Sequence, residues 1–288
     1  MAYPKCSLLW FNGDGGEILV KPFIKWAGGK YRLVSRIQAL LPHGHRLVEP
    51  FVGSAAVWLN TTYSAALLAD ANLDLITLYR TLQRHGEGFI DFCKEFFVPE
   101  NNTPERYYAL RERFNTSQDS WEKSALFLYL NRHGYNGLCR YNAGGGFNVP
   151  FGRYRIPYFP QREMDCFFQR SQTATFIHRD FRAVMANLEP GDVVYCDPPY
   201  VPLSATANFT DYAAGGFGQG DQDDLVQMAR DLGARGIPVL ISNHATEDIR
   251  HAYQGARLES FAVQRFISRD TQNRHTAEEV LALFGGSV

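Results

Sequence analysis

A short apolar run that ends in an acidic residue and two prolines carries the side chains best suited to chemistry. Residues 193–196 read as a buried parallel strand, and Asp197, Pro198, Pro199 and Tyr200 follow directly. Ligands of open α/β sheets bind beyond the carboxyl ends of such strands, and prolines leave carbonyl groups without ladder partners. Asp197 and the Pro198 carbonyl could therefore accept hydrogens from an exocyclic amino group while Tyr200 stacks on its ring. Taken alone, the motif could equally be a strand end with a tight turn.

A second segment combines glycines with lysines ahead of a predicted helix. Residues 25–30 read KWAGGK, and an amphipathic pattern continues to Leu41. The glycines allow the backbone to approach a ligand closely, Trp26 offers an apolar wall, and Lys25 and Lys30 offer positive charge. An ordinary helix N-terminus is the alternative interpretation of this segment.

Two further predicted strands end near acidic residues. Residues 46–50 read as a strand that includes Glu49 and leads through Phe51 and Gly53 into a helix over 55–59. The next strand, 65–70, ends at Asp70. Asp70 follows the glycine-bearing turn by about 20 residues, the spacing at which nucleotide-binding α/β units place a carboxylate for ribose hydroxyls. A single acidic residue at a strand end is common, so this signal is weak alone.

Length and composition bound the class of protein. The chain has 288 residues, of which 45% are hydrophobic and 20% charged, as in a globular protein of one large or two ordinary domains. We expect a cytoplasmic protein, because no apolar stretch has the length of a membrane span or signal-peptide core. The five cysteines show neither CxxC pairs nor zinc-ligand spacing, so we predict no metal site. The net charge of −1 still permits local contact with nucleic acid.

The predicted elements form an α/β pattern with an interruption. Helical stretches at 74–83, 104–114 and 121–131 break the alternation of strands and helices. The pattern resumes with strands at 175–178, 193–196 and 239–242, a helix at 222–234, and an antiparallel pair at 258–266 and 279–284. We therefore expect an N-terminal extension (1–20), a catalytic domain in two parts (21–72 and 171–288) and an inserted domain (73–170). The Gly- and Ala-rich stretch between 202 and 222 is typical of a lid or a disordered loop.

Positive charge gathers in the second half of the insertion. Residues 123–162 include no Asp or Glu, although they carry six Lys or Arg interleaved with aromatic residues. Local positive charge of this kind suits a phosphate backbone. Together with the Gly-rich turn at 143–146, it predicts a hairpin that enters a DNA groove. A solvated loop with a few core aromatics is the alternative.

Taken in order, the motifs at 25–30, 49–53, 70 and 197–200 resemble the Dam-type (D12 class) DNA adenine-N6 methyltransferases. The likeness extends from about Phe23 to Phe284, with target recognition inserted between the glycine loop and Asp197. It implies a class I S-adenosylmethionine-dependent methyltransferase fold. That fold has a Rossmann-like seven-stranded sheet with an antiparallel edge hairpin, here with an inserted, mainly helical target-recognition domain that carries a β-hairpin.

The resemblance also implies an activity and its partners. The enzyme would transfer a methyl group from S-adenosyl-L-methionine to N6 of adenine in double-stranded GATC, after flipping the base out of the duplex. It would act as a monomer on DNA, without a metal or a membrane, in the bacterial cytoplasm near the nucleoid or as a phage-encoded protein.

Site residues follow from the same resemblance. The expected cofactor-binding residues are Trp26, Lys30, Glu49, Phe51, Gly53, Asp70, Asp180, Phe181 and Asp197. The expected catalytic residues are Asp197, Pro198 and Tyr200. Hydrogen bonds to Asp197 and the Pro198 carbonyl would localise the lone pair of the adenine amino nitrogen for attack on the methyl group, without a covalent intermediate.

The DNA-binding residues implied by the resemblance lie in the glycine–lysine loop and the basic segment. They are Tyr135 and Asn136 as a wedge in the duplex, Arg140 as a reader of guanine, Leu138 and Pro150 against a thymine methyl group, Lys25 and Tyr154 at the outer base pair, and Arg132, Asn148 and Arg153 elsewhere on the DNA. Arginine is the usual partner of guanine, and apolar groups meet the thymine methyl.

The chain departs from the family pattern at three places, and two other functions stay open. The first twenty residues are additional, the hairpin turn lacks its usual charged residue, and 270–276 does not match the family's basic loop. These departures concern DNA affinity more than chemistry. The same site could methylate RNA adenine or DNA cytosine-N4, and a DNA-binding regulator with a vestigial transferase site is a third hypothesis.

Overall fold

A seven-stranded sheet positions the site. The computed structural model describes residues 10–11, 17–200, 216–264 and 276–286. The strand order is β5-β4-β3-β6-β7-β9-β8, with β9 antiparallel to β7 and β8 and the other neighbours parallel. The strands are β3 (Arg46–Glu49), β4 (Ala65–Asp70), β5 (Ala174–His178), β6 (Asp192–Cys196), β7 (Val239–His244), β8 (Arg257–Gln264) and β9 (Thr276–Phe284). The sheet confirms the predicted fold class, including the antiparallel edge pair.

Short helices and a small ribbon complete the catalytic part of the chain. The helices are α1 (Val34–Leu40), α6 (Phe181–Met185), α7 (Gln219–Ala234) and α8 (Glu247–Ala252), and the ribbon pairs β1 (Trp10–Phe11) with β2 (Glu17–Ile18). Every residue of β6 is buried, because α/β crossovers cover both faces of parallel strands. This explains why β6 reads as an uninterrupted apolar run rather than an alternating one.

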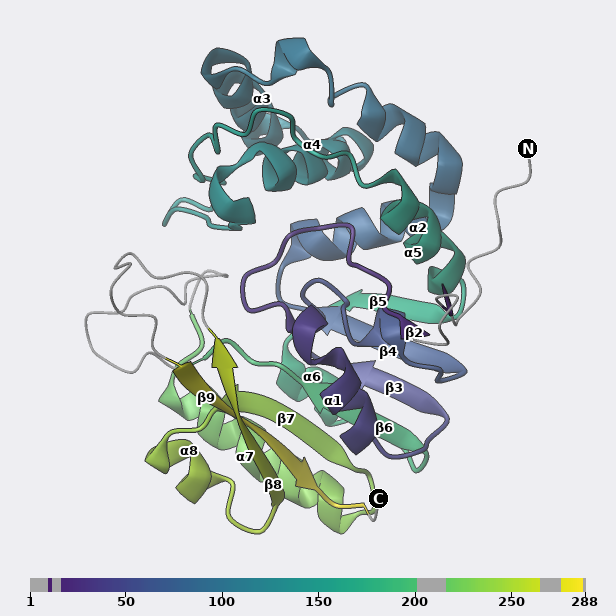
Figure 1. Ribbon diagram of the computed structural model, residues 1–288, viewed down its shortest axis with the longest axis vertical. Helices are drawn as coiled ribbons and strands as arrows, with labels where there is room; N and C mark the ends of the chain where they lie inside the picture. Colours follow the sequence, from purple (N-terminus) through teal and green to yellow (C-terminus); the bar gives the residue numbers. More distant parts are fainter. Residues whose placement is uncertain (1–9, 12–16, 201–215, 265–275, 287–288) are drawn as a thin grey trace.

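Four helices occupy the connection between the neighbouring strands β4 and β5. They are α2 (Leu73–Lys94), α3 (Pro104–Thr116), α4 (Ser120–His133) and α5 (Gln161–Ser171). Asn72, Thr103 and Asp119 cap the first three by accepting a backbone N–H in the first turn. Helices α3 and α4 lie at the end of the molecule opposite β8 (Figure 1). The insertion is therefore helical, as predicted, and lies beyond the edge of the sheet that β5 forms (Figure 1).

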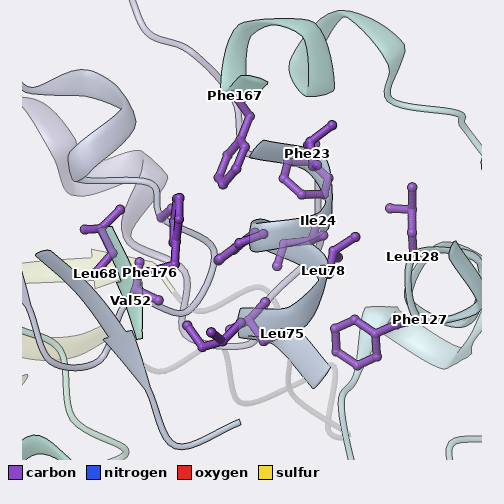
Figure 2. Close-up of a cluster of buried hydrophobic side chains, with 14 of the residues drawn as sticks. Phe23, Ile24, Val52, Leu68, Leu75, Leu78, Phe127, Leu128, Phe167 and Phe176 are labelled. Carbon is purple, nitrogen blue, oxygen red and sulfur yellow. The ribbon is translucent and has the colours of Figure 1, made fainter. Parts of the chain in front are cut away.

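The insertion and the sheet share one hydrophobic core. Leu68 of β4 and Phe176 of β5 belong to the same buried cluster as Leu75 of α2 and Phe127 of α4 (Figure 2). Phe167 of α5 stacks on Phe176 with ring centroids 5.6 Å apart. Apolar burial thus continues from the sheet into the insertion, while the division at 72/73 and 170/171 into separate domains stays a prediction.

Helix α2 has two features that shape this junction. It bends at Gly86, which has a φ of +50° and packs against Phe168. Its Arg80 and Gln83 side chains donate to the Phe176 and Ala174 carbonyls of the edge strand β5. Capping the outer carbonyls in this way discourages pairing of the exposed edge with another strand.

Some expected elements differ from the observed ones. The helix predicted over 55–59 is a 3₁₀ turn, Trp58–Asn60, because Ala55 takes a left-handed φ of +61°. The helix predicted after Lys30 starts as a 3₁₀ turn, Lys30–Leu33, before α1. Further 3₁₀ turns lie at Pro99–Asn101 and Tyr135–Gly137. The sequence did not predict α5, α6 or α8. The N-terminal extension, the loop after Tyr200 and the divergent stretch 270–276 lie largely or wholly outside the described residues.

Candidate active site

A cavity of about 340 Å³ lies at the carboxyl ends of β3, β4 and β6. This is the edge of an open α/β sheet at which ligands bind, and the volume suits a small organic molecule. All residues predicted for the cofactor and for catalysis line the cavity. They are Trp26, Lys30, Glu49, Phe51, Gly53, Asp70, Asp180, Phe181, Asp197, Pro198 and Tyr200. The structure thus brings four separate sequence motifs together around one space.

Asp197 directly follows the end of β6 and lines this cavity. Its Oδ1 atom is 2.8 Å from the Lys30 ammonium and accepts a hydrogen bond from Ser242 Oγ at 2.9 Å. Ser242 lies on the neighbouring strand β7 and contacts the Tyr195 hydroxyl at 3.1 Å. Within the described part of the chain, no hydrogen bond reaches Asp197 Oδ2. One carboxylate oxygen is therefore fixed by the protein while the other can receive a donor.

Lys30 is a buried counter-ion for Asp197. Its side chain is 5% exposed, and its Nζ donates to the Gly28 carbonyl at 2.8 Å and lies 4.8 Å from the centre of the Tyr200 ring. Burial acts to lower the pKa of Lys30, but interactions with Asp197, Tyr200 and Glu279 outweigh it and raise the pKa above its ordinary value. The amine is therefore charged at neutral pH and holds both Asp197 and the glycine loop.

Asp70 closes the far side of the cavity at the end of β4. Its two oxygens accept backbone N–H groups from Asn72 at 2.9 Å and from Gly53 at 3.0 Å. Burial raises the pKa of Asp70, and these hydrogen bonds oppose the rise. Gly53 has a φ of +45°, and a Cβ there would lie 2.9 Å from the Trp26 ring. Only glycine fits this turn, which brings the backbone against both Trp26 and Asp70.

Glu49 is a buried carboxylate at the end of β3. Its side chain is 2% exposed, and Oε1 has no hydrogen-bond partner among the described residues. Burial raises the pKa of Glu49 well above its ordinary value, although a hydrogen bond with the Trp58 backbone opposes this. Burial of a carboxylate oxygen without a hydrogen-bond partner costs free energy. A ligand that donates a hydrogen bond to Oε1 would remove this cost.

An aromatic slot forms the remaining wall. Phe51 and Phe181 lie 5.2 Å apart between ring centroids, and Phe217 approaches both at 5.9 and 6.0 Å. The Arg182 guanidinium lies 4.5 Å from the centre of the Phe181 ring and bonds to Asp180, Asp221 and Asp224. It ties the start of α6 to the start of α7. Asp180 is exposed at the rim, where it also caps α6.

Several site residues escaped the sequence reasoning. Phe217 lines the slot, Ser242 fixes Asp197, and His244 meets the Tyr200 ring edge-on with centroids 4.1 Å apart. An aromatic residue flanked by glycines in the Gly- and Ala-rich stretch was a signal for Phe217. Ser242 and His244 had no comparable signal, because only the pairing of β6 with β7 brings them to the site.

The basic segment forms the predicted hairpin on the surface of the insertion. Asn148 N donates to the Arg140 carbonyl at 3.0 Å, and an isolated antiparallel bridge joins Tyr141 to Phe147. Arg140 is exposed, and Asn148 holds its guanidinium by a 2.7 Å bond from Nε to Oδ1 and a 3.1 Å bond to the Asn148 carbonyl. The hairpin thus presents one arginine in a fixed orientation.

The other residues predicted to contact DNA lie around the base of this hairpin. Tyr135 is 51% exposed, and the neighbouring Asn136 has a φ of +54° in a tight 3₁₀ turn. Lys25 Nζ lies 4.0 Å from the centre of the Tyr154 ring. Leu138 is half-buried, whereas Pro150 and Arg153 are exposed.

Arg132 differs from the rest of that set. It is 8% exposed, and its guanidinium donates to the Phe23 carbonyl. Burial lowers the pKa of Arg132. The residue joins α4 to the segment before the glycine loop, so its observed contacts are internal, while its contact with DNA stays a prediction.

The described residues contain neither a membrane-spanning helix nor a cluster of metal-ligating side chains. No helix there is both long and apolar enough to cross a membrane. Within the same residues, no group of three or more His, Cys, Asp or Glu side chains could hold a metal ion.

The sheet order and the position of the cavity define a class I methyltransferase fold. A family model described as D12 class N6 adenine-specific DNA methyltransferase matches residues 26–267. The DNA adenine methylase of Vibrio cholerae serotype O1 is 50% identical over 265 residues, which cover 92% of this chain and 96% of that protein. The chain therefore belongs to the D12 class of N6 adenine-specific DNA methyltransferases.

Other comparisons agree on the family. The DNA adenine methylase of Serratia marcescens is 50% identical over 92% of this chain and 98% of its own length. That of Escherichia coli K12 is 50% identical over 93% of this chain and 96% of its own length. A precorrin-6Y C5,15-methyltransferase from Geobacter metallireducens aligns with 99% of this chain and all of its own, at a TM-score of 0.39 and 10% identity. That structural likeness is too weak to bear on function. Membership of the family makes DNA the substrate and implies S-adenosylmethionine as the methyl donor.

Proposed function

We propose that the enzyme methylates N6 of an adenine flipped out of double-stranded GATC, with S-adenosylmethionine in the cavity beside Asp197. The observation that carries this proposal is that Asp197, Pro198 and Tyr200 line the same cavity as Asp70 and Glu49. An acceptor pair and an aromatic ring suit a planar base, and buried carboxylates suit the hydroxyl and ammonium groups of a nucleoside amino acid.

The chemistry of the cavity fits the proposed cofactor. Glu49 Oε1 lacks a partner among the described residues, and Asp70 lies where a ribose could be held. Phe51 and Phe181, with ring centroids 5.2 Å apart, offer the cavity an aromatic wall against which a flat ring could lie. When bound, S-adenosylmethionine supplies an electrophilic methyl group. We assign Asp70 to the ribose hydroxyls, Glu49 to the amino-acid end and Phe181 to the adenine ring.

Asp197 and the Pro198 carbonyl act on the target base in this proposal. The lone pair of the adenine amino group is delocalised into the ring, so the nitrogen is a poor nucleophile. Hydrogen bonds from that group to Asp197 Oδ2 and the Pro198 carbonyl favour a localised lone pair and stabilise positive charge as it develops. Lys30 and Ser242 hold Asp197 in orientation from its other oxygen.

The hairpin supports the proposed target sequence. Arg140 has the exposed, braced guanidinium that a bidentate contact with guanine requires. Tyr135 and Asn136 form an exposed, tightly turned wedge that could fill the gap left by a flipped base. We propose Leu138 and Pro150 for the thymine methyl group, Lys25 and Tyr154 for the outer base pair, and Arg153 for the phosphate backbone.

Transfer of a labelled methyl group tests this function directly. We would incubate the protein with labelled S-adenosylmethionine and GATC duplexes, duplexes with one altered base pair, cytosine-containing duplexes without GATC, and RNA hairpins. Label at N6 of adenine in GATC alone supports the proposal. Label in RNA or on cytosine contradicts the substrate, and tight DNA binding without transfer would indicate a regulator with a vestigial site.

Asp197→Ala tests the catalytic centre. The variant should lose at least about 10²-fold in kcat, because it lacks the acceptor that polarises the amino group. Its Kd for GATC duplex DNA should change little, since the hairpin is untouched. Asp231→Ala, an exposed aspartate on α7, is the matched control and should keep full activity. Substantial turnover by Asp197→Ala would contradict the proposed mechanism.

A further inference from the structure

We infer that Asn72 and Cys139 are positioning residues that couple occupancy of the cofactor cavity to placement of the DNA-reading hairpin. The inference rests on the proposed roles of the cavity and the hairpin. It adds a specific physical connection between them, which lies where β4 of the sheet passes into α2 of the insertion.

Asn72 contacts both sides of this junction. Its backbone N–H donates to Asp70 Oδ1 in the cavity at 2.9 Å, and its side-chain Oδ1 caps α2 by accepting from Leu75 N at 3.0 Å. Its Nδ2 donates to Cys139 Sγ at 3.5 Å. Asn72 and Cys139 are 7% and 4% exposed, so water does not compete well for these bonds. A single asparagine thus joins the proposed ribose carboxylate to the hairpin.

Cys139 occupies an informative place in the sequence of the hairpin. It lies between Leu138 and Arg140, the residues proposed to contact a thymine methyl group and a guanine. A shift of Cys139 would move both neighbours, because it is covalently linked to each. Burial raises the pKa of Cys139 to about 12, although hydrogen bonds with Tyr141 and Asn72 oppose the rise, so the group is a neutral thiol at neutral pH.

A second contact fixes the hairpin to the first turn of α2. The Tyr141 hydroxyl donates to Asp74 Oδ2 at 2.7 Å, and Lys123 Nζ of α4 lies 3.1 Å from Asp74 Oδ1. Residues 139 and 141 therefore attach to the N-cap and to the first turn of α2, respectively. The hairpin follows the position of this helix end rather than moving independently.

The glycine–lysine loop has an equivalent link to the recognition segment. The Asn131 side chain accepts from Lys25 N at 2.8 Å and donates to the Lys25 carbonyl at 2.7 Å. Its Nδ2 also contacts the Gly137 carbonyl at 3.4 Å. Two buried asparagines therefore connect the cavity residue Asp70 and Lys25, the neighbour of the cavity residue Trp26, to the two ends of the stretch from Gly137 to Cys139.

The physical basis of the coupling is shared ordering. A ligand held by Asp70 restricts Asn72, and Asn72 restricts Cys139 and its neighbours. When DNA then binds, the hairpin loses less conformational entropy than it would with an empty cavity. Because coupling free energies are reciprocal, DNA must strengthen cofactor binding by the same factor.

A thermodynamic cycle tests the inference. We would measure the Kd for a GATC duplex with and without S-adenosylhomocysteine, and the Kd for S-adenosylhomocysteine with and without the duplex. In the unmodified enzyme, each ligand should tighten the other by at least about 5-fold. Cys139→Ala should reduce both ratios to below about 2-fold, whereas Cys139→Ser keeps an acceptor for Asn72 and should restore most of the coupling.

Controls separate coupling from loss of stability. Cys93→Ala removes an equally buried thiol from α2 and should leave both ratios unchanged. Asn72→Ser keeps a cap for α2 but cannot reach Cys139, so it should behave like Cys139→Ala. Unchanged ratios in Cys139→Ala and Asn72→Ser, in an enzyme that methylates GATC, would overturn the inference and leave the proposed function intact. An enzyme that does not methylate GATC would overturn the proposed function itself.

Discussion

At the scale of single residues, Arg140 and its brace Asn148 form the part of the hairpin best suited to read a base. Asn148 fixes the guanidinium from one side, so less side-chain freedom remains to be lost on binding. Arg140→Ala should cost about 1–3 kcal/mol of discrimination against substitution of the contacted guanine. Competition binding between GATC and single-substituted duplexes measures this difference.

The exposed Arg155 offers a matched control for Arg140. Arg155→Ala removes the same charge from the same basic segment, and should weaken all duplexes to a similar extent. If Arg140→Ala also weakened every duplex equally, Arg140 would be a phosphate contact and our assignment would be wrong.

Where a motif was local, the sequence indicated which side chains lie together. Asp197, Pro198 and Tyr200 follow one another along the chain, so their order alone indicates that they share one location. Ser242 reaches Asp197 only across a strand pair, and no local pattern marks it. Arg132 shows the opposite case, since its charge matches the basic segment while its position on α4 directs it inward.

At the scale of elements, the bend of α2 at Gly86 lets one 22-residue helix follow both the sheet and the insertion. A Cβ at this position would lie 2.6 Å from the Phe168 ring, and the φ of +50° disfavours any other residue. Gly86→Ala should therefore lower the free energy of unfolding by about 1–3 kcal/mol. Urea denaturation followed by circular dichroism measures the loss.

Gly88 in the same helix is the natural comparison. A Cβ there meets nothing within 4 Å, so Gly88→Ala should be neutral or stabilise the protein by about 0.5–1 kcal/mol. Equal effects of the two substitutions would show that the bend at Gly86 does not matter for stability.

Elements were predictable to the extent that their patterns were regular. The strand at 65–70 has the predicted bounds, because its apolar run starts after polar residues and ends at an acid. The turn after Phe51 was misread as a helix because its left-handed Ala55 depends on packing within the folded chain. Helices α6 and α8 are only 5 and 6 residues long, too short for a clear helical period.

At the scale of the whole molecule, a net charge of −1 coexists with a stretch that lacks acidic residues. DNA affinity should therefore depend on salt through a few local contacts rather than through overall charge. Replacing both Arg153 and Arg155 by Ala should reduce the slope of log K against log salt by about 2 units, close to 0.9 for each phosphate contact. Binding titrations across a range of salt concentrations measure the slope.

The exposed Arg84 on α2 provides the charge control for this experiment. Arg84→Ala lowers net charge without touching the basic segment and should leave the slope unchanged. A slope that changed with net charge irrespective of position would contradict a localised DNA surface.

The entire insertion occupies a single crossover between two adjacent parallel strands, which it enters from the carboxyl end of β4 and leaves at the amino end of β5. Exchange of this insertion could give the enzyme a new target sequence, because the strands that carry the proposed cofactor site lie outside it. A transplanted insertion would nevertheless need a thiol or hydroxyl group that accepts the hydrogen bond from Asn72. Without that group, the chimera would bind its new DNA site equally well whether or not the cofactor cavity is occupied.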